Sequence, residues 1–130
     1  MNELAENYDK LVKQAEKELE AWEIGNALHS IWNFVRRTNQ YLEQSKPWIL
    51  AREPEKEAQL TTVLYAAAES TRLLAIYLAP FMPNASDRIM SQLGLEPVGP
   101  SAWIHEAAWG SVPLKTVVPG PLLFPRIETF

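Results

Sequence analysis

The sequence of 130 residues contains no cysteine, which excludes disulfide scaffolds, thiolate zinc sites, iron–sulfur clusters and cysteine nucleophiles. Its two histidines, His29 and His105, lie far apart along the chain, and we expect both at a solvated surface. No HExxH, GxSxG, GxGxxG or Walker-type motif occurs. We therefore expect this chain to carry no catalytic residue, no metal site and no bound cofactor.

Long hydrophobic runs are also missing. No apolar run approaches the roughly 18 residues that a membrane span needs. The charged start of the chain lacks the apolar core of a signal peptide. We therefore expect a cytoplasmic protein that makes no membrane contact. The net charge of −4 argues against a broad basic surface for nucleic acid, although it permits a local basic patch.

Glycine and proline are scarce over residues 1–94 and frequent afterwards. One glycine and four prolines precede Gly94, whereas three glycines and six prolines follow it. Proline removes a backbone donor and clashes within a helix, so residues 95–130 should be extended segments and turns. Apolar residues in this extension, Trp103, Trp109, Leu123 and Phe124 among them, predict that it packs on residues 1–94 or on a partner outside the chain.

Apolar residues at spacings of three and four predict that residues 1–94 form helices. The expected ranges are 4–23, 26–44, 55–79 and 85–93, with Gly25 closing the first. The sequence therefore predicts an all-α fold, a bundle of about four helices followed by an irregular, proline-rich extension.

The second expected helix is the most apolar. We expect its main buried stripe to hold Leu28, Ile31, Trp32, Val35, Asn39 and Leu42. Phe34 and Tyr41 form a second stripe, and the two should merge into an apolar face about half the helix wide. A buried amide needs hydrogen-bond partners, and those expected for Asn39 are backbone groups of residues 46–50. Pro47 should end the helix, since it pushes the preceding residue out of the helical region.

Residues 36–52 form a basic stretch in an acidic chain. It carries four cations, Arg36, Arg37, Lys46 and Arg52, against one anion, Glu43. Trp48 follows the helix-ending proline, so we expect it on a turn. A tryptophan beside cations suits stacking on an unpaired base. The alternative, still open from composition alone, is that Trp48 only covers the core end together with Ile49 and Leu50.

The stretch NQYLEQSKPW, residues 39–48, resembles the Asn-x-Tyr-x5-Pro-Trp signature in the anticodon-binding domain of methionyl-tRNA synthetases. Further matches follow in the same order: Arg72, the segment LAPFMP at 78–83, Gly94, Trp109-Gly110 and the ending PLLFPRIE at 121–128. The resemblance covers about residues 20 to 128. Single pieces are weak because related synthetases share the helical domain, but the ordered set is specific.

The resemblance implies a helical domain that binds the CAU anticodon of methionine tRNA. Trp48 matches the tryptophan that stacks on an anticodon base, and Pro47 would fix its turn. We expect Arg36, Lys46 and Arg52 to contact phosphates, whereas Arg37 points roughly opposite the main stripe of its helix. Asn39 and Tyr41 are expected to support the site structurally.

The parent enzyme implied by the resemblance joins methionine to tRNA with ATP, on a catalytic domain that would be a partner of this chain. The HIGH-like and KMSKS-like signatures of that domain do not occur here. Two further recognition residues of the family, an asparagine and an arginine four positions later, have no counterpart in the sequence. We therefore expect the chain alone to be catalytically inactive.

Three alternatives remain at this point. The domain could belong to the synthetase for valine, isoleucine or leucine, which exchange of anticodons in a binding assay would distinguish. It could be a helical protein-interaction module with no affinity for RNA. A small helical enzyme would need paired charges inside the bundle, and the helix stripes are nearly all apolar.

Overall fold

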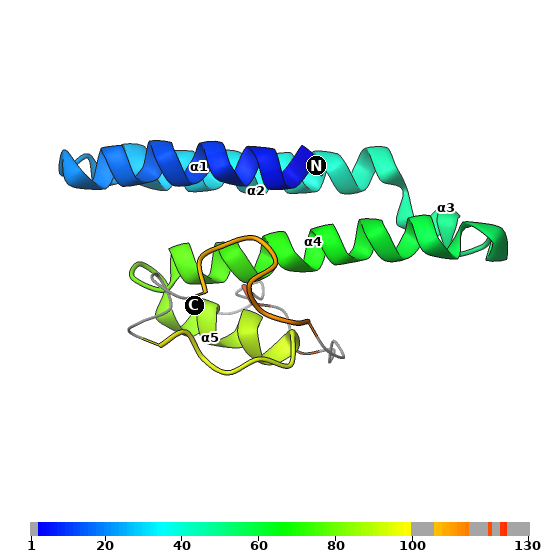
Figure 1. Cartoon of the computed structure of the whole chain (residues 1–130). Helices are drawn as coiled ribbons and strands as arrows, with labels where there is room; N and C mark the ends of the chain where they lie inside the picture. The colour runs from blue at the N-terminus through cyan, green and yellow to red at the C-terminus, as the bar shows by residue number, and fades with distance from the viewer. Residues whose placement is uncertain (1–2, 100–105, 115–119, 121–122, 125–130) are drawn as a thin grey trace, which may run out of the picture. The chain divides into compact units, whose positions relative to one another are not determined.

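The computed structural model describes residues 3–99, 106–114, 120, 123 and 124. Within these ranges the chain forms α-helices and one 3-10 turn, with no strand. The elements are α1 (Glu3–Glu20), α2 (Ile24–Ser45), α3 (Pro47–Leu50), η1 (Pro54–Lys56), α4 (Glu57–Leu78) and α5 (Pro83–Gln92), and Figure 1 labels the α-helices. The all-α prediction is confirmed, and the four longer helices match the expected ranges closely.

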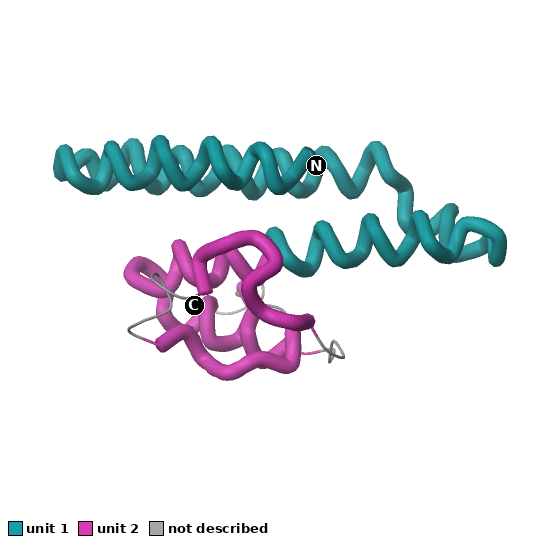
Figure 2. The backbone as a smooth tube through the Cα atoms, viewed as in Figure 1, with its two compact units in different colours: residues 1–70 teal, residues 71–130 magenta. Residues whose placement is uncertain are grey.

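Two compact units, residues 1–70 and 71–130, divide the chain within α4 (Figure 2). The expected boundary at residue 94 between a bundle and its extension stays a prediction. Beyond α5, the described residues contain no regular element.

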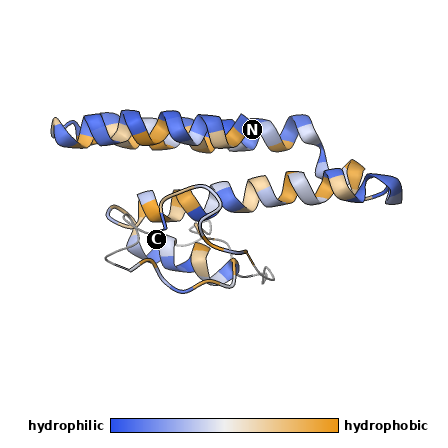
Figure 3. Ribbon diagram, in the orientation of Figure 1, coloured by the Kyte–Doolittle hydropathy of each residue, from blue (hydrophilic) through white to orange (hydrophobic). Residues whose placement is uncertain are grey.

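The first unit is built on the packing of α1 against α2. Both helices are amphipathic, as the alternation of hydrophilic and hydrophobic ribbon in Figure 3 shows. The rings of Tyr8 and Phe34 contact each other in a tilted arrangement with centroids 5.8 Å apart. The buried residues of α2 are Ala27, Ile31, Phe34 and Thr38.

The buried face of α2 is therefore only partly the expected one. Ile31 and Phe34 are buried as expected, but Trp32 is 45% exposed and Asn39 is exposed. Each residue of a helix is turned by about 100° from the one before, so Thr38 and Asn39 cannot share one narrow face. The hydroxyl of Thr38 is compatible with burial because it donates to the carbonyl of Phe34 at 3.0 Å.

The connection between α1 and α2 also differs from the expectation. We expected Gly25 to close the first helix, but α1 ends at Glu20 and Gly25 lies in the first turn of α2. The left-handed residue is Trp22, with φ 61°. The N–H of Glu23 donates to the carbonyl of Glu18 at 2.8 Å, a reverse bond typical of a helix C-terminus that ends in a left-handed residue.

Helix α4 changes character along its length. Residues 57–62 are largely exposed, whereas every residue from Glu69 to Leu78 except Thr71 is buried. A helix that is apolar on all sides belongs in an interior. Hydropathy accounts in this way for the burial of residues 73–78, whereas Glu69, Ser70 and Arg72 are buried polar residues.

The second unit is held by a buried arginine. Arg72 is fully buried, and its guanidinium donates to the carbonyls of Glu106 at 2.7 Å and Ala108 at 3.0 Å. In the same unit, the hydroxyl of the buried Ser86 donates to the carbonyl of Ala75 at 2.7 Å, which joins α5 to α4. Residues 106–108 are thereby tied to α4.

The apolar side chains of the extension have different environments. Trp109 and Leu123 are half-buried, and Phe124 is 66% exposed. Arg88 on α5 donates to the carbonyl of Leu123 at 3.3 Å. Trp103, which we expected to pack with them, lies outside the described residues.

Candidate nucleic-acid interface

A single left-handed residue separates α2 from α3. Pro47 is the first residue of α3 and excludes the helical conformation for Lys46, which adopts φ 48° and ψ 61°. The N–H of Lys46 donates to the carbonyl of Leu42 at 3.0 Å, and its own carbonyl accepts from Ile49 at 2.9 Å. The expected end of the helix at Pro47 is confirmed, and the turn is closed by its own backbone.

Trp48 lies on the outside of this connection. It is 54% exposed and Ile49 is 40% exposed, whereas Leu50 is 6% exposed and so covers the core. We expected Trp48 on a turn, and it stands on the single helical turn of α3. Leu50 fills the interior, and more than half of the surface of Trp48 is open to solvent.

The expected cations of the site are all exposed. Arg36, Lys46 and Arg52 form no ion pair with another residue of the described ranges. The guanidinium of Arg36 donates to the side-chain carbonyl of Asn33, and that of Arg37 to Gln40 at 3.5 Å. These partners are neutral amides, so the positive charge of both arginines remains unneutralised.

The two supporting residues have different environments. Tyr41 is half-buried in α2. Asn39 is exposed, and its side chain makes no hydrogen bond with the described residues, so the expectation of a buried amide that holds residues 46–50 is wrong. The physical reason is that the buried face of α2 passes through Thr38 instead, and that backbone bonds already satisfy the connection.

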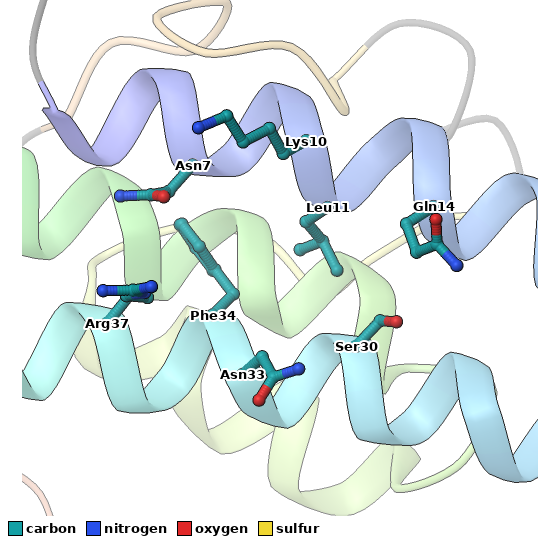
Figure 4. Close-up of a pocket in the computed structure, with 8 residues that line it drawn as sticks. All are labelled: Asn7, Lys10, Leu11, Gln14, Ser30, Asn33, Phe34 and Arg37. Atoms are coloured by element: carbon teal, nitrogen blue, oxygen red, sulfur yellow. The ribbon is translucent and has the colours of Figure 1, made fainter.

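A groove between α1 and α2 was not predicted from the sequence. Its volume is about 170 Å³, and it is lined from α1 by Asn7, Lys10, Leu11 and Gln14 and from α2 by Ser30, Asn33, Phe34 and Arg37 (Figure 4). A neighbouring hollow is lined by Asn33, Arg36, Arg37 and Gln40. No sequence pattern predicted which residues of α1 line the groove, because this depends on how α1 and α2 align.

Other candidate sites receive no support. His29 is exposed, as expected, and His105 lies outside the described residues. Across the described ranges, no group of three or more His, Asp or Glu side chains could hold a metal ion. Nor is any helix within those ranges long and apolar enough to cross a membrane.

Comparison with known proteins gives one family model that matches residues 2–119, described as the anticodon-binding domain of tRNA ligase. The methionine–tRNA ligase of Bacillus subtilis is 38% identical over 120 residues, which are 92% of this chain and 18% of the relative. That of Streptococcus pyogenes serotype M1 is 36% identical over 126 residues, covering 97% and 19%. The chain thus spans about a fifth of the length of these curated relatives.

A solved structure shows the same relation. The apo form of Mycobacterium tuberculosis methionyl-tRNA synthetase matches with a TM-score of 0.80 and 26% sequence identity. The match covers 97% of this chain and 25% of that chain.

Proposed function

Because the chain belongs to the family of anticodon-binding domains of tRNA ligases, we propose that it binds the anticodon loop of methionine tRNA. The observation that carries this proposal is the exposure of Trp48 at a proline-fixed connection flanked by exposed cations. Its matched relatives named as methionine–tRNA ligases favour methionine over the valine, isoleucine and leucine alternatives.

In this proposal Trp48 is the stacking platform. An exposed indole offers a π-face to any unpaired base, and such stacking is worth about 1–3 kcal/mol per base. Pro47 fixes the position of the ring, because it is the first residue of the short helix that carries it. The half-buried Tyr41 on α2 supports the segment that leads to this connection.

Arg36, Lys46 and Arg52 are proposed to bind phosphates. Exposed cations without a carboxylate partner attract the RNA backbone and release its counterions, whatever the base sequence. Stacking and phosphate contacts discriminate poorly between bases. Preference for CAU must therefore come from hydrogen bonds to the bases, and the exposed amide of Asn39 on α2 is one group whose contribution can be tested.

The wider activity is part of the same proposal. The longer protein would attach methionine to this tRNA with ATP, on a catalytic domain that is the partner of this chain. The 130-residue chain itself would perform no chemistry and hold no cofactor. The place of this reaction is the cytoplasm, where tRNA is charged for protein synthesis.

The test is a binding titration of the 130-residue chain with a 17-nucleotide anticodon stem-loop. We expect the CAU loop to bind more tightly than loops in which one anticodon base at a time is replaced. Equal affinity for all loops would restrict the chain to binding RNA without reading its sequence. No binding to any loop would favour the protein-interaction alternative and contradict the proposal.

A further inference from the structure

The groove between α1 and α2 joins the hollow beside it into one basic surface. The two share Asn33 and Arg37 among their lining residues. We call the whole the α1–α2 groove. None of its ten lining residues is an aspartate or glutamate, although the chain as a whole is acidic.

Three cations line this groove, Lys10 from α1 and Arg36 and Arg37 from α2. None of them forms an ion pair with a described residue. The carbonyl oxygens of Asn33 and Gln40 accept from the two arginines, which leaves both amide NH₂ groups as further donors. Cations and amide donors without a carboxylate are the groups that bind an anion with several oxygens.

The charge is concentrated at one end of the groove. In Figure 4, Asn7 and Arg37 lie at the same end, with the amine of Lys10 extended toward it, and Gln14 and Ser30 lie at the other. There the buried Glu18 accepts from the hydroxyl of Ser30 at 3.0 Å and from the amide of Gln14. Its charge is therefore engaged by hydrogen bonds far from the cationic end.

We propose that the cationic end of the α1–α2 groove binds a backbone phosphate of the RNA whose loop stacks on Trp48. The inference rests on the proposed function and adds Lys10 and Arg37 to the RNA contacts. The groove runs along α2, and Trp48 follows on α3 directly after α2 ends, so one RNA strand can follow α2 from the groove to its end at Ser45.

The rise of α2 from the groove to its end gives an approximate spacing for this phosphate. Eight residues separate Arg37 from Ser45 on α2, or about 12 Å at roughly 1.5 Å per residue. A stacked strand carries one phosphate for about every 3.4 Å of rise. The bound phosphate is therefore about three or four nucleotides from the stacked base, beyond the reach of an isolated anticodon triplet.

The experiment compares two RNAs, the 17-nucleotide stem-loop with a CAU anticodon and the trinucleotide CAU. The variant Lys10→Gln with Arg37→Gln should bind the stem-loop about tenfold more weakly at 50 mM salt, with a salt slope lowered by about 0.7 or more. It should bind the trinucleotide as the parent chain does. Trp48→Ala should weaken the binding of both RNAs.

The matched control is Lys13→Gln with Lys17→Gln, which removes two exposed cations of α1 that do not line the groove. Thermal melting followed by circular dichroism checks that both double variants are folded. If the groove double variant has a lower melting temperature than the parent chain, the single variant Lys10→Gln is used in its place. If the groove variant bound the stem-loop as this control does while Trp48→Ala bound it weakly, the inference would be overturned and the proposed function kept. If Trp48→Ala bound both RNAs like the parent, the proposed function would fail as well.

Discussion

Arginines of the two units have opposite surroundings. Arg72 is fully buried and donates to two backbone carbonyls, those of Glu106 and Ala108, so its hydrogen-bonding groups hold the second unit together. Arg36 and Arg37 in the first unit are exposed. Within the described part of the chain, their side chains donate hydrogen bonds only to amide side chains. A buried arginine whose N–H groups are bonded to backbone carbonyls has a structural role. An exposed arginine whose charge is not neutralised by a carboxylate is available to bind an anionic ligand.

The same contrast applies to the large apolar side chains. Leu50 fills the interior beside α3, whereas Trp48, two positions earlier, leaves half of its surface in solvent. The same short helix thus contributes Leu50 to the core and exposes the ring of Trp48 to solvent.

Replacement of the buried arginine should have the largest effect. Arg72→Met leaves the carbonyls of Glu106 and Ala108 without their charged donor. Hydrogen bonds to a charged group contribute about 1.5–3 kcal/mol each, so we expect the free energy of unfolding to fall by about 3 kcal/mol. Chemical denaturation followed by circular dichroism measures this. An unchanged unfolding midpoint would show that Arg72 does not hold residues 106–108.

Trp48→Ala should act on RNA binding and not on stability. Loss of one stacked base corresponds to about 5- to 150-fold weaker binding of the stem-loop. The melting temperature should hardly move, because the ring is 54% exposed. Trp48→Phe keeps a π-face and should retain part of the affinity, so a complete loss with phenylalanine would contradict simple stacking.

The contribution of each exposed cation to RNA binding should be visible in the salt dependence of the affinity. Single Gln substitutions of Arg36, Lys46 and Arg52 should each lower the slope of log affinity against log salt by about 0.7 to 0.9. They should weaken binding to all loop sequences equally. Titrations between 50 and 200 mM salt with the CAU loop and one altered loop test both points. A residue whose replacement leaves the slope unchanged is not a phosphate contact.

Glu43 is the one acidic residue in the basic stretch 36–52, and its side chain is exposed on α2. Repulsion from an exposed charge is worth a few tenths of a kcal/mol because solvent and salt screen it. Glu43→Gln should therefore bind the stem-loop about twofold more tightly at 50 mM salt. Weaker binding would mean that the carboxylate itself contacts RNA.

The smallest effect is expected for Asn39→Ala. A buried amide would have made this change costly, but the side chain is exposed and makes no hydrogen bond within the described ranges. The free energy of unfolding should change by no more than about 0.5 kcal/mol. Urea denaturation measures it, and a loss above about 1 kcal/mol would restore a structural role. Binding to altered loops shows whether Asn39 reads a base.

The helices and their approximate ends could be predicted from the sequence. Apolar residues at spacings of three and four defined the four longer helices, and the steric effect of Pro47 on Lys46 fixed the end of α2. Gly25 was misleading, because the left-handed position at the end of α1 is taken by Trp22. Local backbone sterics thus gave the right elements but not always the residue that closes them.

Features that depend on contacts between helices could not be predicted from the sequence. Two adjoining stripes of α2 were expected to be buried together, but the face packed in the structure holds Ile31 and Phe34 with Thr38, which neither stripe included. The role of Arg72 depends on carbonyls more than thirty residues away. The groove with Lys10 requires the alignment of α1 on α2, which no local pattern encodes.

The most direct test of the account compares two tryptophans of similar exposure in the first unit. Trp48 is 54% exposed on α3, and Trp32 is 45% exposed on α2. We predict that Trp48→Ala weakens binding of the CAU stem-loop by at least about fivefold, whereas Trp32→Ala stays within about twofold of the parent chain. Equal affinities for the two folded variants would contradict the claim that Trp48 is the stacking platform.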